Sequence, residues 1–600
     1  MHPPITLHPR SLFGRRLAWL MVGTLLFVVG CDRAAPDATR SASDSDQSRA
    51  HRVLITEHDD LVSAGLGLTG LKAAAPAPAD PTQPSAAELR QRAMYTQYNS
   101  LSALHTGTGL SPFEATDLPQ VPGVELIAWL ELDAIPHRSR VLLQIPTSFD
   151  VDRPCLVAAP ASGSRGVYGA VPLVAPWALP RGCAVVYTDK GAGTDYVDEA
   201  TGTAVALNGQ RVAIDSDRVG FVPPALAGAQ PSSTANGHGV ATPHAHAEAA
   251  IEPAWGRVTL AAIEWGLAQL NQHLDADFDR GDVATIAAGL SNGGAAVMHA
   301  LEADQDQWID AAVAVMPNIT PPGVPALYDY AATAALYQPC ALGDPDWAAE
   351  LPFANPLLIG FGPVRCENLA GAGLLDEATP EAARAVLTQA GFDDDALVFS
   401  AATVALDVWR SVLVNYASAY TGAAFNDMAC GYQFDATTAT EADKAQWWAT
   451  ENGTPPSETI NIIETRSDRL ANDPHFQGLV CLHQLTDTDG MQRALAAIEA
   501  QARWPHAVPV EIVHGQVDAL IPAALSSRPY VAAARDNGMA LNYQEIEGAN
   551  HFDAFLNALG SDGRFEAILP HGWAAMDRAW QSLQARQEAG EDGPRARPSN

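Results

Sequence analysis

Residues 283–301, VATIAAGLSNGGAAVMHAL, decide which fold this chain adopts. The apolar, β-type run 283–288 leads directly into Gly289-Leu290-Ser291-Asn292-Gly293, and residues 294–301 continue with a helical pattern. A strand, a sharp turn carrying a serine and a helix together form the arrangement known as a nucleophile elbow.

Gly289 and Gly293 are required in this turn for a steric reason. A serine held in a strained turn brings the residues two positions before and after it against the adjoining strand and helix, where side chains would collide. We therefore expect Ser291 to be a nucleophile and the backbone N–H of Asn292 to point at the developing oxyanion. The alternative interpretation is a glycine-rich helix start with a capping serine.

A serine hydroxyl needs a base held by a carboxylate, and behind an elbow of this kind the chain order is Ser, Asp or Glu, then His. Residues 509–515, PVEIVHG, are typical of a buried strand, and Asp518 follows on the next loop. A further strand pattern at 542–547 leads to His551. We expect Asp518 and His551 to complete a triad, with His514 orienting the turn and Asp553 as a less suitable alternative acid.

Outward from the elbow, strand and helix patterns alternate, which indicates an α/β fold with a mostly parallel sheet of the α/β-hydrolase type. Short apolar runs at 155–159, 183–187, 311–316, 510–513 and 541–546 accompany the one at 283–288, and residues 258–270 have helical spacing. Few strand patterns occur between Pro317 and about Ala500. We expect a large cap inserted between the nucleophile and the acid and base loops.

This organisation predicts six segments: a signal peptide (1–30), an Ala/Pro-rich tether (31–95), the first part of the core (96–320), the cap (321–500), the second part of the core (501–585) and a disordered tail (586–600). The tether is predicted mostly without regular structure because of its Ala, Pro, Ser and Asp content, although residues 53–71 can pack on the domain.

A small-residue loop after the strand 155–159 is where this fold supplies its second oxyanion donor, so Ser162, Gly163 and Ser164 are the candidates. The alternative is a flexible turn. His244, His246 and nearby His238 could suggest a metal, but no carboxylate pattern completes a ligand set. We interpret this stretch as a polar loop near the mouth of the site and expect neither metal nor cofactor.

Arginines precede a short apolar run, LAWLMVGTLLFVV at 17–29, which is typical of a secretory signal peptide rather than a membrane span. The run ends in VVGC, which resembles a bacterial lipoprotein signal and implies lipidation of Cys31. An ordinary cleaved signal peptide is the alternative. Export leaves six further cysteines for up to three disulfides, of which Cys340–Cys366 is the simplest sequence-local pair.

With 69 acidic residues against 35 lysines and arginines, the formal net charge is −34. Nucleic acid and anionic membrane surfaces are therefore excluded as general partners. The expected partner is a small-molecule ester, with membrane contact only through the lipid anchor. The oligomeric state is not predicted.

The chain also resembles the D-(−)-3-hydroxybutyrate oligomer hydrolases. The resemblance is carried by APASGSRGVYGAV (159–171), GCAVVYTDKGAGTDY (182–196), ATPHAHAE (241–248), LSNGGAAVMHALEAD (290–304), HGQVDALIP (514–522) and ANHFDAF (549–555). It implies an exported serine esterase that acts on short esters released during poly(3-hydroxybutyrate) breakdown, with the nucleophile at Ser291.

Two other functions fit parts of the pattern. An exported carboxylesterase of the tannase or feruloyl-esterase kind would use the same chemistry on aromatic esters. A lipid-anchored binding protein on an inactive hydrolase fold would not need Ser291, Asp518 and His551 together.

Overall fold

The computed structural model of the chain describes residues 51–54, 59–104, 117–228, 239–344, 356–556 and 565–588. The predicted signal peptide, Cys31, His238 and the last part of the predicted tail, residues 589–600, lie outside them. None of the helices in this described part is long and apolar enough to cross a bilayer.

The centre of the molecule is a nine-stranded sheet in the order β1-β2-β3-β5-β4-β10-β11-β14-β15. The three pairings among β1, β2, β3 and β5 are antiparallel, and all those from β5 to β15 are parallel. The mostly parallel sheet expected from the alternating pattern is confirmed. The strands are β1 (His51–Leu54), β2 (Gly123–Leu130), β3 (Ser139–Pro146), β4 (Cys155–Pro160), β5 (Ala184–Thr188), β10 (Ala284–Leu290), β11 (Ala311–Val315), β14 (Val510–Gly515) and β15 (Asn542–Ile546).

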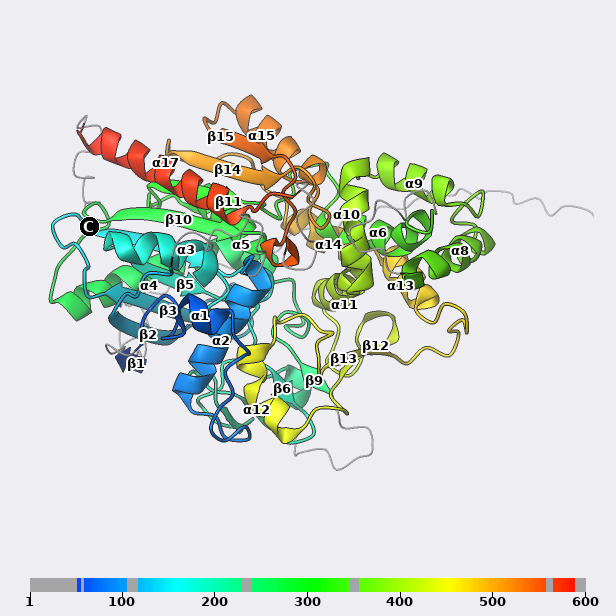
Figure 1. Cartoon of the computed structure of the whole chain (residues 1–600), viewed down its shortest axis with the longest axis horizontal. Coiled ribbons are helices and arrows are strands. Elements are labelled where there is room, and N and C mark those ends of the chain that lie inside the picture. Colours follow the sequence, from blue (N-terminus) through cyan, green and yellow to red (C-terminus); the bar gives the residue numbers. More distant parts are fainter. Residues whose placement is uncertain are drawn as a thin grey trace, which may run out of the picture. The chain divides into compact units, whose positions relative to one another are not determined.

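Helices cover both faces of this sheet, as Figure 1 shows. Helices α3 (Val171–Ala178) and α17 (Leu569–Glu588) lie on one face, and α4 (Trp255–Leu274), α5 (Asn292–Ala303) and α15 (Ser527–Asp536) lie on the other. Alternate residues of one strand therefore enter different cores. In β11, Val313 and Val315 face α3 and α17, whereas Ala312 and Ala314 face α5.

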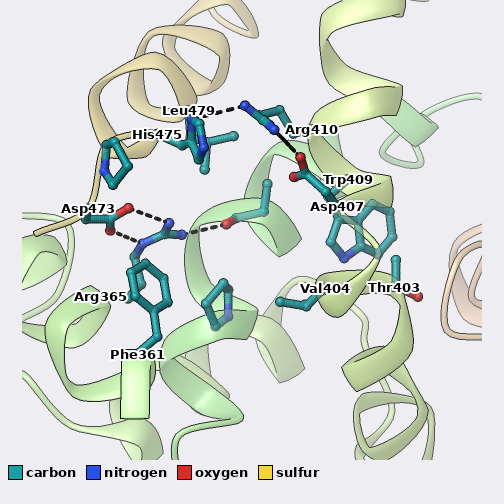
Figure 2. Close-up of a pocket in the computed structure, with 13 residues that line it drawn as sticks. Phe361, Arg365, Thr403, Val404, Asp407, Trp409, Arg410, Asp473, His475 and Leu479 are labelled. Atoms are coloured by element: carbon teal, nitrogen blue, oxygen red, sulfur yellow. Dashed lines mark hydrogen bonds and ion pairs between the residues drawn. The ribbon is translucent and has the colours of Figure 1, made fainter. Parts of the chain in front are cut away.

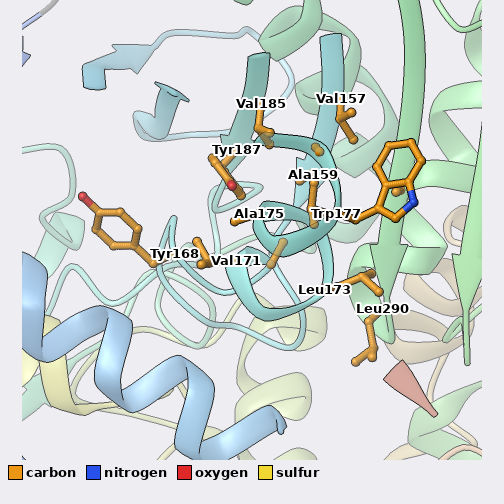
Figure 3. Close-up of a cluster of buried hydrophobic side chains, with 14 of the residues drawn as sticks. Val157, Ala159, Tyr168, Val171, Leu173, Ala175, Trp177, Val185, Tyr187 and Leu290 are labelled. Carbon is orange, nitrogen blue, oxygen red and sulfur yellow. The ribbon is translucent and has the colours of Figure 1, made fainter. Parts of the chain in front are cut away.

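The core beneath α3 positions the strand that carries the elbow. Figure 3 shows Val171, Leu173 and Trp177 of α3 among side chains of β4, β5 and β10, with Leu290 at the end of β10. Val157 and Val185 are completely buried here. Residue 290 directly precedes Ser291, so this packing fixes the end of the strand from which Ser291 projects.

The predicted tether is wrong from residue 86 onward, whereas the packing expected within residues 53–71 is confirmed by Leu61, Val62 and Leu71, which are buried in the main core. Residues 67–71 form α1 (Gly67–Leu71) and residues 86–101 form α2 (Ala86–Leu101), whose Leu89, Ala93 and Met94 are buried in the main core. The buried Arg90 donates to Glu125 of β2 at 2.8 Å. The alanine- and proline-rich composition predicted that the entropy cost of ordering this segment would keep it irregular. The apolar face of α2 and the buried ion pair offset that cost.

Between β11 and β14 the chain forms the expected, mostly helical insertion, which we call the cap. It contains α6 (Leu327–Ala341), α8 (Pro356–Gly371), α9 (Pro380–Gln389), α10 (Asp394–Ala405), α11 (Val408–Thr421), α12 (Glu441–Thr450), α13 (Phe476–Leu485) and α14 (Asp489–Ala497). One small antiparallel pair, β12 (Tyr432–Asp435) with β13 (Asn461–Glu464), accompanies them. Helix α12 packs against α2, so the cap and the N-terminal segment support each other.

Three disulfides link the six cysteines at 155–183, 340–366 and 430–481. The predicted Cys340–Cys366 pair is confirmed, and it joins α6 to α8 within the cap. A second small sheet was not predicted. It has the order β8-β7-β6-β9 and consists of β6 (Val197–Asp198), β7 (Thr203–Val205), β8 (Arg211–Ala213) and β9 (Val240–Ala241).

Candidate active site

Ser291 lies in a sharp turn between β10 and α5. Its backbone angles are φ 60° and ψ −124°, a region that residues with side chains rarely adopt. Its N–H donates to the carbonyl of Val315 on the neighbouring strand at 2.9 Å, which ties the turn to the sheet. The strand, turn and helix predicted around Ser291 are all present.

Both elbow glycines lie where a side chain would collide with backbone. A Cβ at Gly289 would lie 2.3 Å from the carbonyl oxygen of Gly293, and one at Gly293 would lie 2.4 Å from the carbonyl oxygen of Pro160. The second contact has a further consequence. Pro160 ends β4 and begins the small-residue loop, so Gly293 lets that loop approach Ser291.

The structure brings Ser291, His551 and Asp518 together in one hydrogen-bonded chain. His551 Nε2 lies 2.9 Å from Ser291 Oγ, and His551 Nδ1 lies 2.7 Å from Asp518 Oδ2. With the proton on Nδ1 donated to the carboxylate, Nε2 is free to accept the serine proton. All three residues are at least 95% buried, although they lie far apart in the sequence.

The Asp518 carboxylate is stabilised in its charged form. Burial alone would raise its pKa, but the charge of His551 and the hydrogen bonds from His514 and His551 lower the pKa below its usual range. Its other oxygen accepts the N–H groups of Leu520 and Ile521 at 2.9 and 2.7 Å. Asp518 can therefore remain an anion when the imidazole becomes charged.

Asn550 joins the loops that carry Asp518 and His551, and His514 holds the loop of Asp518. Asn550 Oδ1 accepts the N–H of Ala519 on the acid loop and that of His551 on the base loop. His514 is completely buried and donates from Nε2 to the carbonyl of Ile521 at 2.8 Å, with Asp518 Oδ2 at 3.4 Å. His514 therefore orients the turn, as predicted, and also lies against the acid.

The alternative acid, Asp553, does not contact His551. Its two carboxylate oxygens accept the N–H groups of Ile568 and Leu569 at 2.8 and 3.0 Å, where α17 begins. The N–H groups at the start of a helix have no acceptor within the helix. Asp553 caps a helix, which leaves Asp518 as the partner of the histidine.

The candidate oxyanion loop lies beside Ser291, and its three candidates are not equivalent. Gly163 and Ser164 line the same cavity as Ser291 and Asn292. The N–H of Ser162 instead donates to the carbonyl of Gly169 at 3.4 Å. The first N–H groups of a helix have no intrahelical partner, so Asn292, at the start of α5, retains a donor for a ligand.

A completely buried lysine, which was not singled out from the sequence, holds this loop. Lys190 Nζ donates to the carbonyl oxygens of Ala161 and Gly163, the second at 3.2 Å, and lies 5.2 Å from the centre of the Trp255 ring. Burial lowers the pKa of Lys190 to about 7. The carbonyl of Gly163 shares its peptide plane with the N–H of Ser164, so Lys190 fixes the direction of that N–H.

The stretch with His244 and His246 has no helix or strand and reaches the cavity-lining Ser164, so the predicted loop near the site is confirmed, but its histidines are buried and not exposed at the mouth. His244 and His246 are both completely buried. His244 Nδ1 lies 2.6 Å from Ser164 Oγ, and its Nε2 lies 2.7 Å from Glu252 Oε1. His244 thus anchors the oxyanion loop, a role that depends on contacts across 80 residues. Within the described ranges, no three metal-binding side chains gather.

A cavity of about 490 Å³ opens at Ser291 between the core and the cap. The cap contributes apolar side chains of α11 and its surroundings, among them Leu406, Val408 and Val412. Tyr416 of α11 accepts a hydrogen bond from Asn292 Nδ2 at 2.9 Å, which joins the cap directly to the elbow. Arg165 and Phe552 complete the wall near the hydrogen-bonded chain.

The sheet order, the elbow after a parallel strand, the inserted cap and the Ser–His–Asp chain define an ester hydrolase with the α/β-hydrolase fold. The chain belongs to the 3HB-oligomer hydrolase family, whose family model matches residues 47–589. It is 33% identical to the D-(−)-3-hydroxybutyrate oligomer hydrolases of Burkholderia pseudomallei (strain K96243) and Burkholderia mallei (strain ATCC 23344), over 88% of this chain and 84% of each relative.

Solved structures with related topology are more distant. Candida antarctica lipase A shares 12% identity at a TM-score of 0.31, over 72% of this chain and 73% of its own. The rice cell wall degrading esterase LipA from Xanthomonas oryzae shares 12% identity at a TM-score of 0.33, over 79% and 92%. At these TM-scores the solved structures carry no weight, and the fold class depends on the sheet order and site geometry of the chain itself.

Proposed function

We propose that the protein hydrolyses ester bonds of short 3-hydroxybutyrate oligomers through an acyl-enzyme formed on Ser291. The observation that carries the proposal is the buried Ser291–His551–Asp518 chain at the end of a cavity, in a chain of the 3HB-oligomer hydrolase family. The names of the Burkholderia relatives support the choice of substrate.

In the proposed reaction, Ser291 Oγ attacks the ester carbonyl carbon while His551 Nε2 takes the serine proton. Asp518 keeps the imidazole in the required tautomer and stabilises its charged form. The N–H of Asn292, with that of Gly163 or Ser164, donates to the oxyanion. His551 then protonates the leaving alcohol, and water releases the acid from Ser291 by the same steps, so the proposed cycle uses no cofactor.

The direct test of the nucleophile is Ser291→Ala. Turnover of the (R)-3-hydroxybutyrate dimer should fall by about 10⁴-fold or more, because residual rates without a triad member come only from binding and the oxyanion donors. Thermal unfolding should remain close to that of the wild type, since Ser291 Oγ bonds only His551 among the described residues. Normal turnover in this variant would rule out the assignment.

Chromatography of products from defined hydroxybutyrate trimers, run beside a feruloyl ester, tests the substrate. Release of monomer and dimer supports the proposal, and exclusive cleavage of the aromatic ester would favour the tannase-like alternative. Labelling of Ser291 by a fluorophosphonate tests the inactive binding-protein alternative, because an inactive site would not be labelled.

We also propose that the protein is exported, lipid-anchored at Cys31 and active on oligomers released from poly(3-hydroxybutyrate) outside the cytoplasm. The apolar segment ending in VVGC and the three disulfides support this placement. Metabolic labelling with a palmitate analogue should mark the wild-type protein and not Cys31→Ser. Equal labelling of both would exclude the anchor.

A further inference from the structure

Arg165 is a buried cation in the wall of the catalytic cavity, and its surroundings do not neutralise it. The residue is 8% exposed, and its guanidinium lies between the oxyanion loop and the base loop. A Cβ built on Gly163 would lie 2.9 Å from a terminal nitrogen of Arg165, and the guanidinium carbon lies 5.9 Å from the centre of the Phe552 ring. Phe552 directly follows the base His551.

Across the described ranges, no carboxylate pairs with this guanidinium, and its buried Nε has no hydrogen-bond partner. Burial lowers the pKa of Arg165 to about 10, with no acidic group opposing the effect. An unpaired buried charge destabilises a folded protein, so a ligand of opposite charge would relieve a cost that no described protein group offsets at Arg165.

A second pocket, in the cap, contains two arginines whose guanidinium groups are paired within the protein. Figure 2 shows Arg365 there with its guanidinium directed at Asp473, and the two are joined at 2.6 Å. Arg410 in the same pocket bonds Asp407 and lies 3.0 Å from His475. Both of these cations have partners in the protein, in contrast to Arg165.

The proposed substrate carries one negative charge in a fixed place. An oligomer of 3-hydroxybutyrate has a free hydroxyl at one end and a free carboxylate at the other. The carboxylate always lies on the alcohol side of every ester bond in the oligomer. Methyl-bearing units fit the apolar part of the cavity, which includes Leu406, Val412 and Ile521. No neutral part of the substrate matches a guanidinium as well as a carboxylate does.

We propose that Arg165 binds the free carboxylate of the substrate on the leaving-group side, so that the enzyme cleaves at the carboxyl end of the oligomer. This inference rests on the proposed function. Ser291 Oγ forms a bond to the ester carbon and the bond from that carbon to the leaving oxygen breaks. His551 protonates that oxygen, and the product that leaves first carries the carboxylate from Arg165. The acyl group remains on Ser291 until water releases it.

The test compares the (R)-3-hydroxybutyrate dimer as the free acid with its methyl ester, at a pH where the acid is ionised. Wild-type kcat/KM should favour the free acid by about 10²-fold to 10³-fold, the range for one buried charge pair. In Arg165→Gln the ratio of the two kcat/KM values should fall to about 1. Arg165→Lys should retain part of the preference. The matched control Arg410→Gln, in the pocket of Figure 2, should keep the wild-type ratio.

A wild-type ratio near one, or an equal loss on both substrates in Arg165→Gln, would overturn the proposal and leave Arg165 a purely structural role. A further measurement needs no variant. 3-Hydroxybutyrate should inhibit hydrolysis of p-nitrophenyl butyrate competitively in the wild type, and its neutral amide should not. Equal inhibition by both would also contradict carboxylate binding. If the wild type cleaves p-nitrophenyl butyrate but neither dimer, the proposed function itself fails.

Discussion

At the scale of single residues, the elbow owes its geometry to the absence of two side chains. The positive φ of Ser291 places Oγ toward His551, and this conformation persists because the Val315 carbonyl holds its N–H and because Gly289 and Gly293, two positions before and after it, have no Cβ to collide with backbone. Gly293 matters beyond the turn itself, since it is the point at which the elbow touches the start of the oxyanion loop.

Gly293→Ala tests that contact. The added Cβ would lie 2.4 Å from the Pro160 carbonyl and 3.2 Å from that of Ala161, so the loop has to move away from Ser291. We expect kcat to fall by about 10²-fold or more, the effect of losing one oxyanion donor. Fluorophosphonate labelling should persist at a reduced rate. Unchanged kcat would show that the loop 161–164 does not contribute a donor.

At the scale of elements, β4, β5 and the chain after β9 converge on one loop. Its carbonyls bond Lys190, which follows β5, and its Ser164 hydroxyl bonds His244, which follows β9. Three separate segments thus determine the direction of the backbone N–H groups of Gly163 and Ser164. We infer that Lys190 and His244 are positioning residues, because they act on the proposed donors rather than on the substrate.

Lys190→Met tests this positioning. Without the N–H donors of Lys190 Nζ, the peptide between Gly163 and Ser164 loses its fixed orientation, so kcat should fall by about 10-fold to 100-fold with a smaller change in KM. A rise in KM with kcat preserved would contradict the proposed role.

Lys190→Met should also change how the free energy of unfolding depends on pH. The folded-state pKa of Lys190 is lowered to about 7, against the ordinary value of 10.5. Between these values the unfolded chain binds the proton and the folded chain does not, so the contribution of Lys190 rises with pH and is lost as pH falls through about 7. From about pH 7 to pH 10, urea unfolding should show the wild type gaining up to about 1.4 kcal/mol per pH unit relative to Lys190→Met. A constant difference would contradict a buried lysine that is neutral above pH 7.

The sequence predicted those elements whose signals are local. The strand–turn–helix around Ser291 and the loops that carry Asp518 and His551 follow strands that periodicity reveals, and their order along the chain is that of the fold. The anchors of the oxyanion loop gave no such signal, since His244 reaches Ser164 only after folding. Helix α2 was not predicted because the composition of the segment gives no sign of the one buried row of side chains on α2. The Arg90–Glu125 ion pair joins residues far apart in the sequence and gives no local signal either.

At the scale of the whole molecule, the proposed substrate and the protein surface have charges of the same sign. The formal net charge of the chain is −34, whereas the cavity wall carries Arg165, and Lys190 lies behind the oxyanion loop. In the proposed function, an ionised oligomer would approach a repulsive surface and bind at the positive charge of Arg165. Salt affects these two interactions differently, because exposed charges are screened strongly and buried pairs are screened much less.

We therefore expect kcat/KM for the free-acid dimer to rise by about 2-fold to 5-fold between about 10 mM and about 150 mM NaCl, as the screening length shortens from about 30 Å to about 8 Å. The neutral methyl ester serves as the control and should change little over the same range. In Arg165→Gln the rise with salt should persist, because it originates in the surface charge and not in the cavity. A fall in kcat/KM for the free acid with salt would mean that attraction by Arg165 governs the approach of the substrate.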